Sequence, residues 1–302
     1  MAISGAGRRV RGRVRFLTGG LAALLAAAAV TLLAPAPSFA QPSLARAAPA
    51  VAVSGGALAD AGSGAMLWSR GLDTRRPMAS ITKVMTALVV LRAGGLTRRI
   101  TVTPAAIAYA RRNSASTAGL VAGDVLTAQQ LLEGMLLPSG ADAAYLLASA
   151  YGPGTAAFIG RMNALAKAIG MTSTHFSDFA GLPVPTESST YSTPADLIRL
   201  AERAMARPVF RQVVAQRSYL LPAGPGHRRY LWIQTDKLVG SYAGATGIKT
   251  GYTHGAGTCL LFEATRGRRT LIGVVLHASV TYTPPAAVAA AERLLSWGFT
   301  QP

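Results

Sequence analysis

The sequence has 302 residues, half of them hydrophobic and 14% charged, which is typical of a globular protein and excludes a disordered chain. The net charge of +18 would suit a polyanion. The basic residues are dispersed, however, and no zinc-finger or other nucleic-acid motif is present, so we expect no nucleic-acid partner. A single cysteine, Cys259, and four scattered histidines give no internal disulfide and no metal-ligand spacing, so we expect no metal and no cofactor.

The segment 1–40 predicts an export signal. Five arginines lie between residues 8 and 15, residues 16–33 are uncharged, and Ser38-Phe39-Ala40 resembles a cleavage site. Because a run of this length, uncharged and mostly apolar, can just span a bilayer, an uncleaved membrane anchor is the alternative to a cleaved signal at 1–40. Either case predicts an exported protein in the cell wall or at the membrane. Residues 41–50 are interpreted as a linker that precedes one domain at 51–302.

The remaining pattern places β-like segments on both sides of a helical block. Two apolar runs at 51–59 and 65–68, separated by the turn residues 60–64, predict a β-hairpin. Further elements are expected as helices at 80–91, over most of 104–150, at 158–169, from Ser192-Thr193-Pro194 onward and at 285–297, and as strands at 217–221, 230–234, 258–265 and 271–277. The simplest architecture is one sheet built from both chain ends, with helices packed around it.

The first motif that carries chemistry is Ser80-Ile81-Thr82-Lys83. If Ser80 starts the helix, Lys83 lies about one turn later on the same face, where its amine can reach the hydroxyl. A serine hydroxyl needs a base to become a nucleophile, and a lysine can act as that base when burial lowers its pKa. The apolar run 84–91 favours such burial. Taken alone, the motif also fits a helix start followed by a solvated lysine.

Two further motifs follow in a fixed order. Ser139-Gly140-Ala141 separates two expected helices, where a second hydroxyl could relay a proton; the alternative is a plain helix–helix turn. Lys249-Thr250-Gly251 opens an expected strand, where the cation and hydroxyl could bind a substrate carboxylate and the glycine admits close backbone approach; the alternative is a turn between strands. The ordered set is far more specific than any one motif and matches that of penicillin-binding proteins and class A β-lactamases.

From about residue 51 to 299 the sequence resembles the low-molecular-mass D-alanyl-D-alanine carboxypeptidases, serine peptidases of the penicillin-binding superfamily. The resemblance extends beyond the three motifs to residues 77–87, 162–163, 170–171, 181–182, 192–193, 247–253 and 256–257. It implies that 51–302 is a catalytic domain with an α+β, β-lactamase/transpeptidase-like fold. In that fold an antiparallel sheet is built from both chain ends and surrounded by helices.

The resemblance also implies a reaction, in which the terminal D-alanine is removed from peptidoglycan stem peptides through a Ser80 acyl-enzyme. Lys83 would be the general base and Ser139 the proton relay. The backbone N–H groups of Ser80 and Tyr252 would bind the oxyanion. The implied substrate-binding residues are Lys249, Thr250, Gly251 and Tyr252. β-Lactams would acylate Ser80 as covalent inhibitors.

Two segments depart from the family pattern. Ala141 stands where an Asn is usual, so a water or another side chain must replace its hydrogen bonds, and we expect retained but altered activity. Gln234-Thr235-Asp236 stands where an Asn-rich segment is common, and no role is assigned to it.

Three alternative functions use the same residues differently. A transpeptidase would pass the acyl group to an amine from the same site. A class A-like β-lactamase would need a catalytic glutamate, but the residues around Glu187 do not form the expected Glu-x-x-Leu-Asn. A non-catalytic cell-wall-binding protein, decayed at Ala141, is the alternative of another class, and retention of the other motif residues argues against it.

Overall fold

The computed structural model describes residues 47–302, which belong to one compact unit. The predicted export signal at 1–40 and residues 41–46 of the predicted linker lie outside the described residues. Residues 47–50 have no regular secondary structure. None of the helices described has the length and apolar character needed to cross a membrane.

Short elements alternate along the described chain. The strands are β1 (Gly55–Asp60), β2 (Met66–Arg70), β3 (Arg99–Thr101), β4 (Val125–Thr127), β5 (Ser218–Leu221), β6 (Tyr230–Ile233), β7 (Ala245–Thr253), β8 (Gly257–Arg266) and β9 (Arg269–Leu276). The α-helices are α1 (Thr82–Ala93), α2 (Pro104–Arg112), α3 (Ala128–Leu136), α4 (Ala141–Tyr151), α5 (Thr155–Ala168), α6 (Pro194–Met205), α7 (Pro208–Val214) and α8 (Pro284–Gly298), and a 3-10 helix, η1 (Ala79–Ile81), precedes α1.

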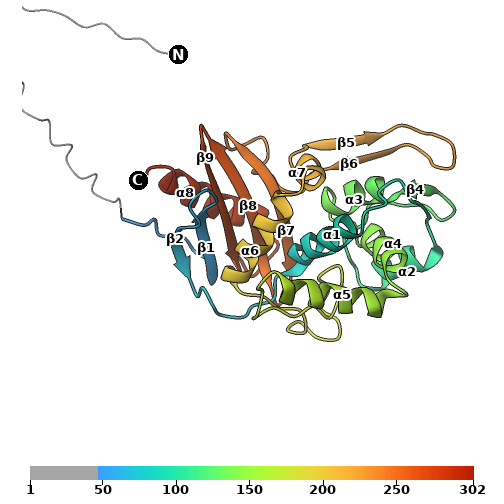
Figure 1. The fold of residues 1–302 in the computed structure, drawn as a ribbon, viewed down its shortest axis with the longest axis horizontal. Helices are drawn as coiled ribbons and strands as arrows, with labels where there is room; N and C mark the ends of the chain where they lie inside the picture. The colour runs from blue at the N-terminus through green and yellow to red at the C-terminus, as the bar shows by residue number, and fades with distance from the viewer. Residues whose placement is uncertain (1–46) are drawn as a thin grey trace, which may run out of the picture. The chain divides into compact units, whose positions relative to one another are not determined.

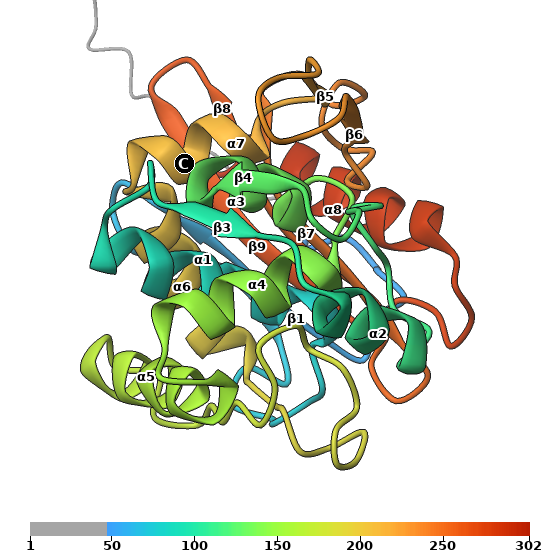
Figure 2. The ribbon, with the colours of Figure 1, turned by 90° about the vertical axis from the view of Figure 1, so that its right-hand side faces the viewer.

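A five-stranded antiparallel sheet in the order β2-β1-β9-β8-β7 joins the two ends of the described chain. Alternate residues of β9 enter two apolar cores, Ile272 and Val274 on one face and Val275 on the other, as the two-residue period of a strand requires. Helix α8 covers one face, and α6 and α1 lie on the other (Figures 1 and 2). The predicted α+β fold, with a sheet from both chain ends, is confirmed.

Helix α1 runs through the middle of the helical block and is buried from Thr82 to Leu91. Its sequence is predominantly apolar on every side, as expected of a helix surrounded by protein. The burial includes Lys83, one of the polar residues in this stretch, and so removes its amine from bulk solvent.

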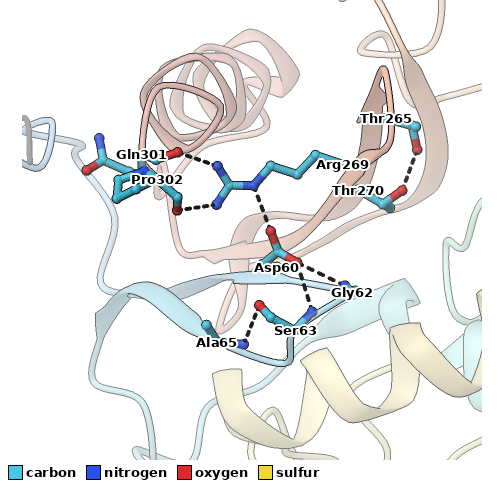
Figure 3. Close-up of polar contacts among 9 residues, drawn as sticks. All are labelled: Asp60, Gly62, Ser63, Ala65, Thr265, Arg269, Thr270, Gln301 and Pro302. Atoms are coloured by element: carbon cyan, nitrogen blue, oxygen red, sulfur yellow. Dashed lines mark hydrogen bonds and ion pairs between the residues drawn. The ribbon is translucent and has the colours of Figure 1, made fainter. Parts of the chain in front are cut away.

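The hairpin predicted near the start of the domain is confirmed as β1 and β2. Its turn is organised by Asp60, whose carboxylate accepts hydrogen bonds from the N–H groups of Gly62 (2.9 Å) and Ser63 (3.0 Å). The other carboxylate oxygen pairs with Arg269 at 2.6 Å, and this arginine also donates to main-chain oxygens of the last two residues (Figure 3). Arg269 therefore ties the hairpin to β9 and to the segment that follows α8.

The predicted helical stretch at 104–150 is wrong in its middle. Residues 113–127 leave the helix and end in β4, which pairs with β3. Gly119 and Gly123 take positive φ values there, which a right-handed helix excludes. Thr127 then caps α3, so helical structure resumes.

Candidate active site

Ser80 lies in η1, one turn before α1, and not within the α-helix that the sequence predicted. The cause is Ala79, whose φ of 48° is in the left-handed region that non-glycine residues rarely adopt. A Cβ atom at Gly181 would lie 1.9 Å from the carbonyl oxygen of Ala79, and one at Gly251 would lie 3.1 Å from the nitrogen of Ser80. These two close approaches hold the strained backbone in place, a feature typical of functional sites.

Lys83 is 1% exposed and reaches back to the nucleophile segment. Its Nζ donates to Ser80 Oγ at 2.8 Å and to the carbonyl oxygen of Ala180 at 2.7 Å. Burial lowers the pKa of Lys83 to about 8, although the negative charges of Asp178 and Asp142 oppose the shift. A substantial fraction of the amine is therefore neutral near pH 8, in the form that accepts a proton from a hydroxyl.

The carbonyl that binds Lys83 belongs to a rigid turn. The N–H groups of Ala180 and Leu182 both donate to Asp178 Oδ1, at 2.7 and 2.9 Å, and Tyr109 donates to the other carboxylate oxygen. Gly181, in the middle of the turn, has a φ of 79° and no room for a side chain. The acceptor for Lys83 is thus fixed by main-chain geometry, which no motif revealed.

Ser139 lies in the turn between α3 and α4 with a φ of 65° and 5% exposure. The next residue must be glycine, because a Cβ at Gly140 would lie 2.6 Å from the carbonyl oxygen of Gly134. Within residues 47–302 the Ser139 hydroxyl makes no hydrogen bond. It is therefore available to a substrate atom.

Ala141, the departure from the family pattern, is fully buried and does not line the cavity beside Ser80. The sequence suggested that a water or another side chain replaces the usual Asn. The partner that Lys83 does have, besides Ser80, is the main-chain carbonyl of Ala180. The adjacent Asp142 accepts hydrogen bonds from the Thr117 hydroxyl (2.5 Å) and from two backbone N–H groups of the same loop. It holds the loop that lines one side of the cavity.

The third motif lies in the second half of β7, not at its start, and β7 is an edge strand. Thr250 lines the cavity, whereas Lys249 is fully buried directly beside it, with Nζ 3.1 Å from the carbonyl oxygen of Thr250. Burial lowers the pKa of Lys249 well below its ordinary value, the nearby charge of Lys83 adds to the shift, and Asp236 opposes it. Lys249 thus stands behind the wall of the cavity that Thr250 presents.

Thr235 is a residue of the site to which the sequence assigned no role. Its hydroxyl lies 2.8 Å from the Thr250 hydroxyl and 3.2 Å from the carbonyl oxygen of Leu137. Leu137 precedes Ser139 by two residues, so Thr235 connects the third-motif strand to the second-motif turn. The signal that could have found it is a hydroxyl residue shortly before the strand that carries the Lys-Thr-Gly motif.

The three motifs meet at one cavity of about 330 Å³. Its lining includes Ser80, Lys83, Ser139, Thr250, Gly251 and Tyr252. A nucleophile with its base, a second hydroxyl and an edge strand thus face the same space, as acyl transfer to serine requires. In the described part of the chain, no group of three or more His, Cys, Asp or Glu residues could hold a metal ion.

Comparison with known proteins identifies the family. The family model described as D-alanyl-D-alanine carboxypeptidase matches residues 43–280. The chain belongs to this family of serine peptidases. A D-alanyl-D-alanine carboxypeptidase of Streptomyces sp. is 40% identical over 250 residues, which cover 79% of this chain and 84% of that protein. The carboxypeptidase DacB2 of Mycobacterium tuberculosis is 38% identical over 240 residues, 80% of each chain.

Solved structures of the carboxypeptidase family agree with this assignment. The Streptomyces DD-transpeptidase superposes with a TM-score of 0.79 at 40% identity and covers 84% of this chain and 99% of its own. A D-alanyl-D-alanine carboxypeptidase from M. tuberculosis gives a TM-score of 0.78 at 35% identity, over 87% of this chain and 96% of that one. The family, the fold class and the serine peptidase class of enzyme expected from the sequence are confirmed.

Proposed function

We propose that this member of the family removes the terminal D-alanine from peptidoglycan stem peptides, with Ser80 as the nucleophile. The observation that supports this most directly is the 2.8 Å hydrogen bond between Ser80 Oγ and the buried amine of Lys83. In its neutral form Lys83 takes the hydroxyl proton as Ser80 Oγ bonds to the scissile carbonyl carbon. The protein then carries an ammonium at Lys83 and a tetrahedral oxyanion on the substrate.

The substrate fits the cleft in one direction. Its terminal carboxylate lies at the Thr250 hydroxyl, with the charge of Lys249 behind it. Its scissile carbonyl lies beside Ser80, where the N–H groups of Ser80 and Tyr252 stabilise the oxyanion. Because β7 is an edge strand, the peptide can add to the sheet through main-chain hydrogen bonds. Gly251 leaves room for that backbone.

The acyl-enzyme forms when the carbon–nitrogen bond breaks. Ser139 passes the proton from Lys83 to the departing amine, so D-alanine leaves neutral in proton count and Lys83 is again a base. A water then attacks the ester, gives its proton to Lys83 and restores the Ser80 hydroxyl. β-Lactams acylate the same oxygen and are released slowly.

Transfer to an amine is the second candidate function. The Streptomyces relative is called a D-alanyl-D-alanine carboxypeptidase among the curated proteins and a DD-transpeptidase among the solved structures. The same site can therefore serve both acceptors, since an amine can replace water in the second step. A non-catalytic wall-binding protein and a β-lactamase are the alternatives that the experiment below excludes.

The proposed location is outside the cytoplasm, in the cell wall or at the membrane. The support is the order of arginines, uncharged residues and Ser38-Phe39-Ala40 within the segment 1–40.

A diacyl-L-lysyl-D-alanyl-D-alanine peptide tests the proposal. We expect release of free D-alanine and, with a fluorescent penicillin, a covalent adduct that mass spectrometry assigns to Ser80. Absence of both would refute the function. Rapid turnover of the penicillin with no D-alanine release would instead identify a β-lactamase. The Ser80→Ala variant must lose both reactions, and a pure binding protein would keep its affinity for cell wall in that variant.

A further inference from the structure

The cavity beside Ser80 has one acidic side chain among its described lining residues, Glu187. The mechanism proposed above does not use it. Within residues 47–302 Glu187 forms no ion pair. A carboxylate that lines a substrate cavity without a cationic partner is a candidate for binding a group on the substrate.

Glu187 is held in this position from two sides. Thr253 of β7 donates a hydrogen bond to Glu187 Oε2 at 2.9 Å. The loop that carries Glu187 closes in a turn in which the Thr186 N–H donates to the Ser189 hydroxyl at 3.1 Å. Gly255 leaves space for the side chain, because a Cβ atom there would lie 2.8 Å from both Cβ and Oε2 of Glu187. One carboxylate oxygen is therefore fixed, and the other has no partner among the described residues.

The place of Glu187 along β7 indicates which part of the substrate it meets. Thr253 lies three residues beyond Thr250, which corresponds to about 10 Å at a rise of roughly 3.3 Å per residue. A peptide whose carboxylate lies at Thr250 and whose scissile carbonyl lies beside Ser80 runs on toward Thr253. The residue that precedes D-Ala-D-Ala then reaches Glu187.

The charges of the cleft follow the same direction. Lys83 and Lys249 lie at the end that receives the peptide carboxylate, and Glu187 lies at the opposite end. A carboxylate only accepts hydrogen bonds, and a primary amine is protonated at neutral pH. A peptide with a carboxylate at its end and an amine on its third side chain therefore matches the cleft in both sign and order.

We propose that Glu187 is a specificity-determining residue that binds a charged amine on the side chain preceding D-Ala-D-Ala. This inference rests on the carboxypeptidase function proposed above. It adds a preference for donor peptides that carry a free side-chain amine.

Two peptides that differ only at this amine test the inference. One is Nα-acetyl-L-lysyl-D-alanyl-D-alanine, and the other carries a second acetyl group on Nε. For the natural protein we expect kcat/KM to be about tenfold higher with the free amine, as for a hydrogen bond between charged groups. In Glu187→Gln, which keeps the size and the acceptor for Thr253, the ratio falls to about one. Glu202→Gln removes a carboxylate from α6, outside the cleft, and must keep the ratio of the natural protein.

The outcomes separate this inference from the function beneath it. Equal turnover of both peptides by the natural protein overturns the role of Glu187 and leaves the carboxypeptidase function intact. Equal slowing of both peptides in Glu187→Gln, with acyl-enzyme accumulating in the mass spectrum, also overturns it, because Glu187 would then activate the deacylating water. No release of D-alanine from either peptide refutes the proposed function itself.

Discussion

The two halves of the cleft are built differently. In the first half, Lys83 is buried and holds Ser80 Oγ and a main-chain carbonyl at 2.8 and 2.7 Å. In the second half, the Ser139 hydroxyl has no partner in the described chain, and Ala141 contributes no polar group. The base that activates the nucleophile is therefore organised by the fold alone, whereas protonation of the leaving amine is completed by the substrate. Preorganised polar groups contribute most to catalysis, so the first half should dominate the rate.

The largest effect is expected from Ser80→Ala, which breaks the first half outright. Without the nucleophile no acyl-enzyme forms, and D-alanine release should fall by at least about 10⁴-fold. The measurement is the initial rate of D-alanine release together with penicillin labelling. Ser296→Ala, an exposed serine on α8, is the matched control and should keep the full rate.

Ser139→Ala tests whether the second half is a separate unit. Loss of a positioned proton donor should lower the acylation rate by about 100-fold, measured as the rate of penicillin labelling and of D-alanine release. A loss as large as that of Ser80→Ala would contradict the comparison, because Ser139 would then belong to nucleophile activation.

The pH dependence of acylation examines the first half without a mutation. Burial lowers the pKa of Lys83 to about 8, and only the neutral amine accepts the Ser80 proton. Acylation should therefore rise with pH, by about tenfold from pH 7 to pH 9, and then level off. Stopped-flow penicillin acylation gives the profile, with circular dichroism to verify folding at each pH. A flat profile would show that Lys83 is not the base.

The smallest effect is expected from Ala141→Asn, which adds a polar group to the second half. An amide there can bond the substrate, so acylation of the peptide should increase about threefold, the size of one net hydrogen bond. Because Ala141 is fully buried, the melting temperature should decrease slightly. Stopped-flow acylation and calorimetry measure the two effects, and an unchanged acylation rate would mean that the cleft does not lack this group.

The parts of the site that could be predicted are those set by local spacing. Ser80 and Lys83 are three residues apart, so any helical turn brings them together, and the strand periods of β8 and β9 are visible in the apolar pattern. The carbonyl of Ala180 could not be predicted, because it is 97 residues from Lys83 and a main-chain group has no sequence signature. Thr235 was missed because its partners are also distant in the chain.

Lys249 shows a different limit of the sequence. The motif identified the residue, but alternation along a strand does not say how deep a side chain lies behind its neighbour. Only the packed structure shows that Thr250 presents its hydroxyl to the cavity while Lys249 is covered.

Ala79 and Ser80 are enclosed by Gly181 and Gly251, glycines that come much later in the chain, the second of them in its last fifth. A growing or unfolded chain that contains only the first motif therefore has no properly shaped serine. Penicillin labelling thus reports that the last part of the polypeptide has reached its final position. For a protein that crosses a membrane before it folds, this arrangement delays reactivity until transport is finished.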